Sequence, residues 1–106
     1  MLTDEYRSKI LRILEEDPEI SQRDLAQELG ISLGKANYCL RGLMEKGLVK
    51  ANNFKNSNNK AAYMYLLTRK GLSEKARATT RFLERKVAEF EALQREIEIL
   101  RREARK

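Results

Sequence analysis

Residues 21–47 read SQRDLAQELGISLGKANYCLRGLMEKG, and this stretch contains the signals that define the fold class. Ser21 is a favourable helix N-cap and Asp24 follows three residues later, so the pattern predicts that a helix begins here. Gly30 suits the left-handed residue that ends a helix. The apolar residues between these signals recur at helical spacing and predict one buried face, made of Leu25, Ala26 and Leu29.

A second helix is predicted directly after the first. Ser32 can cap it and Gly47 can end it. The residues expected on its buried face are Ala36, Leu40 and Leu43. Cys39 lies near that face, which favours a small core residue over a redox-active thiol. Two short helices joined by a turn of three or four residues containing Gly30 are typical of a helix-turn-helix.

The flanking segments complete a winged helix. Upstream, a helix is predicted from the cap Thr3 to the residue before Pro18, because proline disfavours helical conformation in its predecessor. Its apolar stripe consists of Tyr6, Ile10, Leu11, Ile13 and Leu14. Downstream, residues 48–54 and 61–67 are extended stretches on either side of a polar, asparagine-rich turn at 55–60, which predicts a β-hairpin.

The remainder of the chain is predicted to form one long helix. Thr68 can cap it, it runs from about residue 69 to near 105, and Gly71 lies in its first turn, where a glycine costs little. With Leu83 at position a of a heptad, six of the seven core positions from there on are apolar, and Lys86 is the exception. The apolar seam expected to form a dimer interface consists of Leu83, Phe90, Leu93, Ile97 and Leu100.

The predicted fold class is therefore mainly α with a small β-hairpin wing: a winged helix-turn-helix at residues 1–71 and a long dimerising coiled-coil helix at 72–106. Pairing with a second copy would hide the seam from water. The direction of pairing stays open, because Glu96 and Arg101 could bridge a parallel pair, but exposed ion pairs contribute only about 0–1 kcal/mol. Alternatively, the helix folds back on its own winged helix and the chain stays monomeric.

Composition excludes several classes of protein. The chain has 106 residues, of which 42% are hydrophobic and 36% charged, with no histidine and one cysteine. No apolar run approaches the length of a membrane span, and the first residues include acids where a secretion signal has basic residues. Most acid–base catalysis and the common metal sites lose their usual side chain without histidine. We expect a cytoplasmic binding protein that is not an enzyme and has no cofactor, metal or membrane partner.

Positive charge is concentrated in the middle of the chain. Residues 1–30 carry a net −4, residues 31–71 a net +7 and residues 72–106 a net +3. A local basic segment indicates a polyanionic partner, most simply nucleic acid, although an ordinary solvated surface would carry the same charges.

The helix that begins at Ser32 is the predicted recognition helix. Asn37 can pair with adenine, and Lys35 or Arg41 with guanine or phosphate. Close approach to DNA would explain Gly34 in a helix. The predicted contacts are Ser32, Leu33, Gly34, Lys35, Asn37, Tyr38 and Arg41. The alternative is that these residues are a solvated polar surface.

A second set of contacts is predicted for phosphates and the minor groove. These residues lie at a helix start and in the wing turn, and they are Ser21, Gln22, Arg23, Lys55, Asn56, Asn58, Asn59 and Lys60. Asparagine also favours turns for its own reasons, and Ser21 can act only as a cap.

Several motifs resemble a known family. Leu40–Val49 and the Leu67–Gly71 segment, with its Leu-Thr-x-x-Gly pattern, resemble MarR-type winged-helix regulators. Residues 31–35 through 52–56 are similar to the small bacterial group of exopolysaccharide-associated MarR-family regulators. Residues 56–60 lack the Asp-x-Arg that such wings usually carry, and the usual additional N-terminal dimer helix is not evident.

The resemblance implies a homodimeric bacterial transcriptional regulator that binds double-stranded DNA, with exopolysaccharide genes as targets. It leaves open whether a small-molecule effector exists. A different class also remains: a winged-helix adaptor whose coiled coil recruits another protein. An adaptor has no need for positive charge on the recognition helix and wing together, so the basic segment discriminates between the two.

Overall fold

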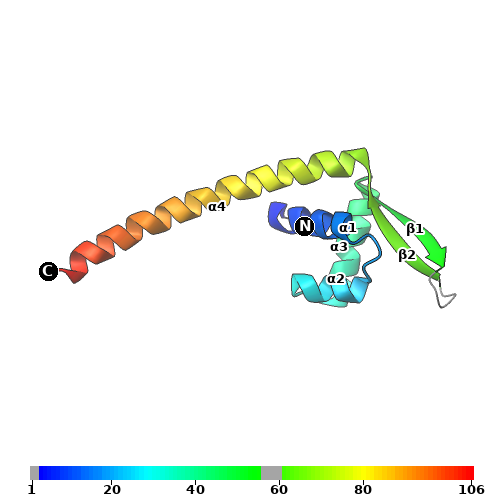
Figure 1. Ribbon diagram of the computed structural model, residues 1–106, viewed down its shortest axis with the longest axis horizontal. Helices are drawn as coiled ribbons and strands as arrows, with labels where there is room; N and C mark the ends of the chain where they lie inside the picture. Colours follow the sequence, from blue (N-terminus) through cyan, green and yellow to red (C-terminus); the bar gives the residue numbers. More distant parts are fainter. Residues whose placement is uncertain (1–2, 56–60) are drawn as a thin grey trace.

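The computed structural model describes residues 3–55 and 61–106. Three helices are followed by a two-stranded hairpin and one long helix (Figure 1). The elements are α1 Asp4–Glu16, α2 Gln22–Leu29, α3 Leu33–Glu45, β1 Val49–Lys55, β2 Ala61–Leu67 and α4 Arg69–Ala104. The order and type of these elements confirm the predicted mainly α fold with a β-hairpin wing.

Each helix begins at the residue that the sequence predicts as its cap. The side-chain oxygens of Thr3, Ser21, Ser32 and Thr68 accept the backbone N–H three residues on, at 3.2, 3.0, 3.1 and 3.0 Å. These bonds satisfy amides that a helix start leaves without partners. The left-handed glycines that follow α2 and α3 are Gly30, with φ 67°, and Gly47, with φ 73°.

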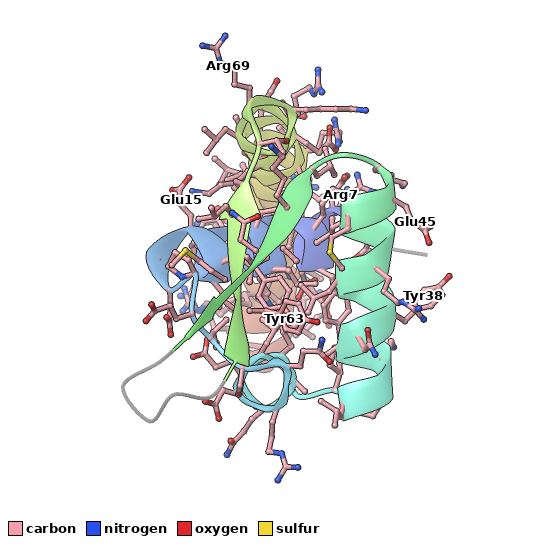
Figure 2. The ribbon with its side chains drawn as sticks, turned by 90° about the vertical axis from the view of Figure 1, so that its right-hand side faces the viewer. Arg7, Glu15, Tyr38, Glu45, Tyr63 and Arg69 are labelled. Atoms are coloured by element: carbon pink, nitrogen blue, oxygen red, sulfur yellow. The ribbon has the colours of Figure 1, made fainter. Side chains whose placement is uncertain are left out.

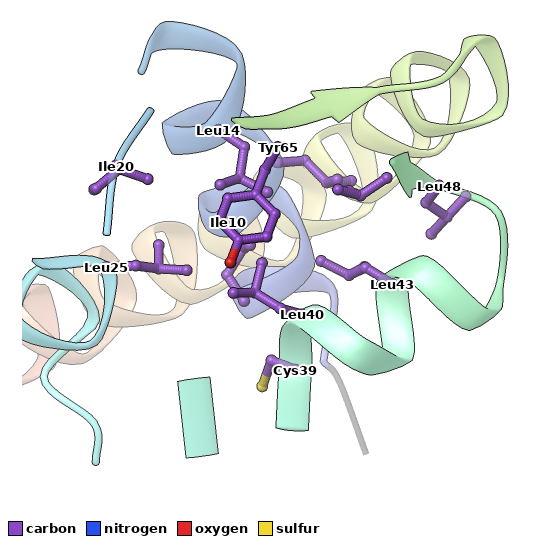
Figure 3. Packing of buried hydrophobic residues seen from close by; sticks show 11 residues of the cluster. Ile10, Leu14, Ile20, Leu25, Cys39, Leu40, Leu43, Leu48 and Tyr65 are labelled. Atoms are coloured by element: carbon purple, nitrogen blue, oxygen red, sulfur yellow. The ribbon is translucent and has the colours of Figure 1, made fainter. Parts of the chain in front are cut away.

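The core lies where the first three helices meet the base of the hairpin. Its fully buried large side chains are Ile10, Leu11, Leu14, Leu25, Leu40 and Leu43. Figure 3 shows the Tyr65 ring of β2 among Ile10, Leu14 and Leu40. Cys39 is buried beside them, and burial raises the pKa of its thiol, as expected for a core residue rather than a reactive one.

The hairpin is fixed to the helices at its base. Its strands pair antiparallel in register from Val49 opposite Leu67 to Lys55 opposite Ala61. The Tyr65 backbone N–H donates to the carbonyl of Pro18 at 2.8 Å, which ties β2 to the loop between α1 and α2. The hairpin therefore has a defined orientation relative to α3, and its residues 56–60 lie outside the described residues.

Gly71 has a packing role that its sequence position does not reveal. A Cβ on this residue would run into the backbone carbonyl of Leu48. That carbonyl also accepts a hydrogen bond from the Thr68 backbone N–H at 3.0 Å. The first turn of α4 is thus pressed against the start of the wing, and the glycine is required by close approach rather than merely tolerated.

The first half of α4 packs along α1. Ala78 is fully buried, and the hydroxyls of Ser8 and Thr79 lie 2.7 Å apart. Ion pairs surround this contact, including Lys75 with Glu15 at 2.8 Å. The predicted division at residue 71 therefore falls in the first turn of a continuous helix whose next turns rest on the winged helix.

Two arginines join the far end of this contact to the start of α1. Arg81 and Arg85 each donate to the Asp4 carboxylate at 3.0 Å. Hydrogen bonds from Arg81, then from Arg85, lower the pKa of Asp4 to about 2. Beyond Arg85 the helix extends away from the body, and the molecule measures 70 by 27 by 22 Å (Figure 1).

Candidate nucleic-acid interface

Helix α3 has one buried and one exposed face. Ala36, Cys39, Leu40 and Leu43 point into the core. On the other side Leu33 is 47% exposed and Tyr38 is 67% exposed, and Figure 2 shows Tyr38 directed away from the body. Large apolar side chains are thus left in water beside polar ones, which is typical of a binding surface.

Most of the predicted recognition residues share this exposed face. Leu33, Asn37 and Arg41 are spaced by four residues and therefore lie in one row along the helix. Arg41 is exposed and Asn37 is half-buried. Gly34 is also exposed, and a Cβ there would meet nothing within 4 Å. The fold does not require this glycine, so its small size is available for a close approach from outside.

Lys35 lies somewhat apart from that row. Its Nζ is 5.9 Å from the centre of the Tyr6 ring on α1, at the outer range of a cation–π contact. Its backbone N–H is the one that Ser32 caps. In this conformation the ammonium group flanks the recognition face, a position suited to a phosphate rather than a base edge.

At the start of α2, two of the predicted contact residues form hydrogen bonds within the chain. The Ser21 hydroxyl accepts the backbone N–H of Asp24, so it acts as a cap. The Gln22 side chain donates to the Tyr65 hydroxyl at 3.1 Å, so its amide serves the junction between α2 and the hairpin. Arg23 is exposed and remains the residue of this group best placed for a phosphate.

The wing can be described only in part. Lys55 is the last residue of β1, and the predicted contacts Asn56, Asn58, Asn59 and Lys60 lie outside the described residues. Lys50, nearer the base of β1, is exposed. The predictions for the wing turn therefore remain predictions.

Tyr63 is a candidate that the sequence reasoning missed. It is 55% exposed, its ring stacks on Tyr65 at 6.3 Å between centres, and Figure 2 shows it between the hairpin and α3. Tyr63 and Tyr65 are two residues apart on β2, so their side chains lie on the same face of the strand. The two-residue spacing of these tyrosines was the signal available in the sequence. Tyr63, the one farther from the hairpin base, is the one left exposed.

The charge distribution agrees with this surface. The segment 31–71, with its net +7, comprises α3, the hairpin and the first turn of α4. Its single acid, Glu45, is at the C-terminal end of α3. Basic side chains are thus gathered on the elements that present the exposed aromatic and apolar residues, a combination suited to nucleic acid.

Two other kinds of site can be assessed for the described residues. Residues 3–55 and 61–106 bring together no group of three or more potential metal-ligating side chains. Within the same ranges, no helix combines the length and apolar character that crossing a bilayer requires.

Comparison with known proteins supports the fold. Residues 3–50 match the family model described as winged helix-turn-helix DNA-binding. Among solved structures, the chain is similar to the adhesin competence repressor (AdcR) from Streptococcus pyogenes, with a TM-score of 0.65 and 20% identity. That match covers 84% of this chain and 64% of the repressor chain, so less than two thirds of the repressor is represented.

A second solved structure is more distant. It is a possible transcriptional regulator from Methanosarcina mazei Go1, with a TM-score of 0.46 and 14% identity over 78% of this chain and 72% of that chain. None of the curated proteins matches the sequence significantly. The described architecture has the element order of a winged helix-turn-helix, and the family match covers its first three helices and the start of β1.

Proposed function

We propose that this chain is a homodimeric bacterial transcriptional regulator that binds double-stranded DNA through α3 and the hairpin. The observation that carries the proposal is the exposed face of α3, where Leu33, Tyr38 and Arg41 stand in water within a segment of net charge +7. A helix-turn-helix presents such a face to the major groove, with the N-terminal residues of its second helix nearest the bases.

The roles of individual residues follow from their chemistry and placement. The Arg41 guanidinium can bridge the O6 and N7 atoms of guanine, and the Asn37 amide can pair with the adenine edge. Leu33, at the first turn of α3, is suited to contact a thymine methyl group. Lys35, Arg23 and the wing lysines Lys55 and Lys60 supply phosphate contacts, which position the protein without reading sequence.

Dimerisation is proposed because α4 leaves an apolar seam in water. In the described chain Leu83, Phe90 and Leu100 are 59%, 59% and 58% exposed. Isolated apolar residues on a surface are normal, but a repeating stripe along several turns marks an interaction site. A second copy would cover the stripe by symmetry, and a two-fold dimer matches an operator with two inverted half-sites.

The target and mode of action come from the resemblance to MarR-type regulators and to the exopolysaccharide-associated group. The fold likeness to a repressor agrees with regulation by operator occupancy in the cytoplasm, a mechanism that needs no chemistry. We therefore propose that the protein regulates exopolysaccharide genes. The first DNA to test is the region upstream of the protein's own gene.

The test is a fluorescence anisotropy titration of the full chain on that upstream duplex and on a shuffled duplex of the same composition. Binding should be tighter on the upstream duplex, and Arg41→Ala should remove about 1–3 kcal/mol of that preference. The matched control is Arg12→Ala, which removes the same charge from an exposed position on α1. Equal loss in both variants would show that α3 is not the recognition element, and no binding to either duplex would favour an adaptor.

A further inference from the structure

The C-terminal part of α4, residues 83–104, is called the distal helix. Its first turn still meets α1, through the ion pair of Arg85 with Asp4 at 3.0 Å. Leu93 is 53% exposed and Ile97 37% exposed, so the seam identified above continues along the whole distal helix.

The seam also faces away from the winged helix where the two parts meet. Successive residues of an α-helix are rotated by about 100°, so Leu83 and Arg85 lie roughly 160° apart around the axis. Because Arg85 reaches back to α1, Leu83 points nearly the opposite way. The winged helix of the same chain therefore leaves the seam accessible to another helix.

The charged residues on the two sides of the seam differ, so their pattern favours one direction of helix pairing over the other. With Leu83 at position a, the three g positions carry glutamates, and the three e positions carry Val87, Gln94 and Arg101. The glutamates are Glu89, Glu96 and Glu103. In parallel coiled coils a g residue faces the following e residue of the other helix, whereas antiparallel pairing sets g against g and e against e.

From this pattern we infer that the distal helices of two copies pair in parallel. The inference rests on the homodimer of the proposed function and adds its orientation. In the parallel arrangement Glu96 faces Arg101 of the second copy, twice by symmetry, and Glu89 faces Gln94. The antiparallel arrangement would place glutamates opposite glutamates along one side, which repel each other.

Whether Glu96 and Arg101 can form the inferred bridge depends on their contacts within their own chain. In the described structure the ion pairs of the distal helix are Arg85 with Asp4 at 3.0 Å, Lys86 with Glu89 at 3.2 Å and Glu103 with Lys106 at 3.7 Å. Among the described residues, Glu96 and Arg101 form no ion pair in their own chain. Both are therefore available to a second copy without breaking an existing contact.

Parallel pairing also places both DNA-binding surfaces at one end. The hairpin and the C-terminus lie at opposite ends of the chain in Figure 1, and α3 and the strands are seen from the hairpin end in Figure 2. A two-fold axis along the paired helices would put both α3 helices across one duplex, with a stalk of about 33 Å directed away from it. Antiparallel pairing would separate the two winged helices by that stalk.

Disulfide exchange distinguishes the two directions. In a full chain carrying Cys39→Ala, Leu100→Cys and separately Ile97→Cys introduce one thiol each at the seam. Parallel pairing sets each thiol beside its own copy, so a glutathione redox buffer should give covalent dimers in about tenfold excess or more over the outward-facing Glu98→Cys control. Two variants guard against a single position with poor disulfide geometry.

Three results would overturn the inference. One is crosslinking no greater than that of Glu98→Cys at both positions. Another is crosslinking found only in a mixture of Leu83→Cys and Leu100→Cys chains, as antiparallel helices require. The third is a chain that sediments as a monomer at micromolar concentration, which would leave the seam to another protein.

DNA binding of the same variants is measured separately, so the two proposals fail independently. Parallel dimers that bind no DNA would refute the proposed function and leave the pairing intact. DNA binding by an antiparallel dimer would refute the parallel pairing and leave the proposed function intact. DNA binding by a monomer would refute the pairing and the homodimer and leave only the DNA-binding role.

Discussion

Replacing Gly71 with alanine tests how α4 is joined to the winged helix. The added Cβ would overlap the backbone carbonyl of Leu48, which cannot swing aside as a flexible side chain can. That carbonyl also accepts hydrogen bonds from Thr68, from the backbone N–H at 3.0 Å and from the hydroxyl at 3.2 Å. Any shift that relieves the overlap therefore disturbs the cap of α4 and the start of β1.

The size of the effect follows from two opposing contributions. Overpacking at a tight contact typically costs about 1–3 kcal/mol, and weakening a hydrogen bond adds about 0.5–1.5 kcal/mol. Because alanine has a higher helix propensity than glycine, the substitution also stabilises the helix by at most about 1 kcal/mol, and by less in a first turn. We therefore expect Gly71→Ala to lower the free energy of unfolding by about 1–3 kcal/mol.

Gly42→Ala is the matched control. Gly42 lies inside α3, and a Cβ there would meet nothing within 4 Å, so alanine should stabilise the chain by up to about 1 kcal/mol. Urea unfolding of both variants and the parent at one protein concentration measures the difference. If Gly71→Ala is as stable as the parent while Gly42→Ala behaves as expected, the close approach of α4 to Leu48 is refuted.

Three further predictions concern charge and recognition. Because the pKa of Asp4 lies at about 2, below its ordinary 3.8, its contribution to stability is present above pH 4 and lost as the pH falls toward 2. Asp4→Asn should flatten acid unfolding in that range, and an unchanged acid profile would contradict this role. Lys86→Leu should strengthen dimerisation in sedimentation equilibrium by removing the one charge in the seam, whereas a weaker dimer would exclude position 86 from it. Asn37→Ala should relax base preference at one operator position in a competition assay, and loss that is equal across sequences would assign Asn37 to phosphate.

Local signals explain why so much of the fold could be predicted. Thr3, Ser21, Ser32 and Thr68 each cap a helix because the bond joins residues only three apart, a distance that the sequence itself specifies. The buried faces of the helices follow from apolar spacing in the same way. Neither requires knowledge of the tertiary arrangement.

Contacts between distant segments could not be predicted from such signals. The close approach of Gly71 to Leu48 and the bond from Gln22 to Tyr65 depend on how the hairpin docks. In isolation Gly71 is an interruption of a helix, and Gln22 is a polar residue free for DNA. The same limit applies to Asp4, whose arginine partners are about eighty positions away in the sequence.

The recognition surface could be predicted in part from local signals, and the rest depends on contacts between distant segments. The sequence predicts Leu33, Asn37 and Arg41 as recognition residues, and the structure leaves Leu33 and Arg41 exposed and Asn37 half-buried. Tyr63 was missed because strand alternation predicts a shared face with Tyr65 but not that the helices end before covering it. Exposure depends on where neighbouring elements stop, which no local pattern records.

The salt dependence of DNA binding tests the proposed function most directly. The full chain is titrated against the duplex from upstream of its gene, with fluorescence anisotropy as the readout, at about 50 to about 300 mM salt. Over a range of this order, counterion release changes the affinity measurably. If each of two copies neutralises about three phosphates, the slope of log K against log salt should be about −5. A slope near zero, with affinity unchanged across the series, would contradict the assignment of α3 and the basic segment 31–71 as a DNA-binding surface.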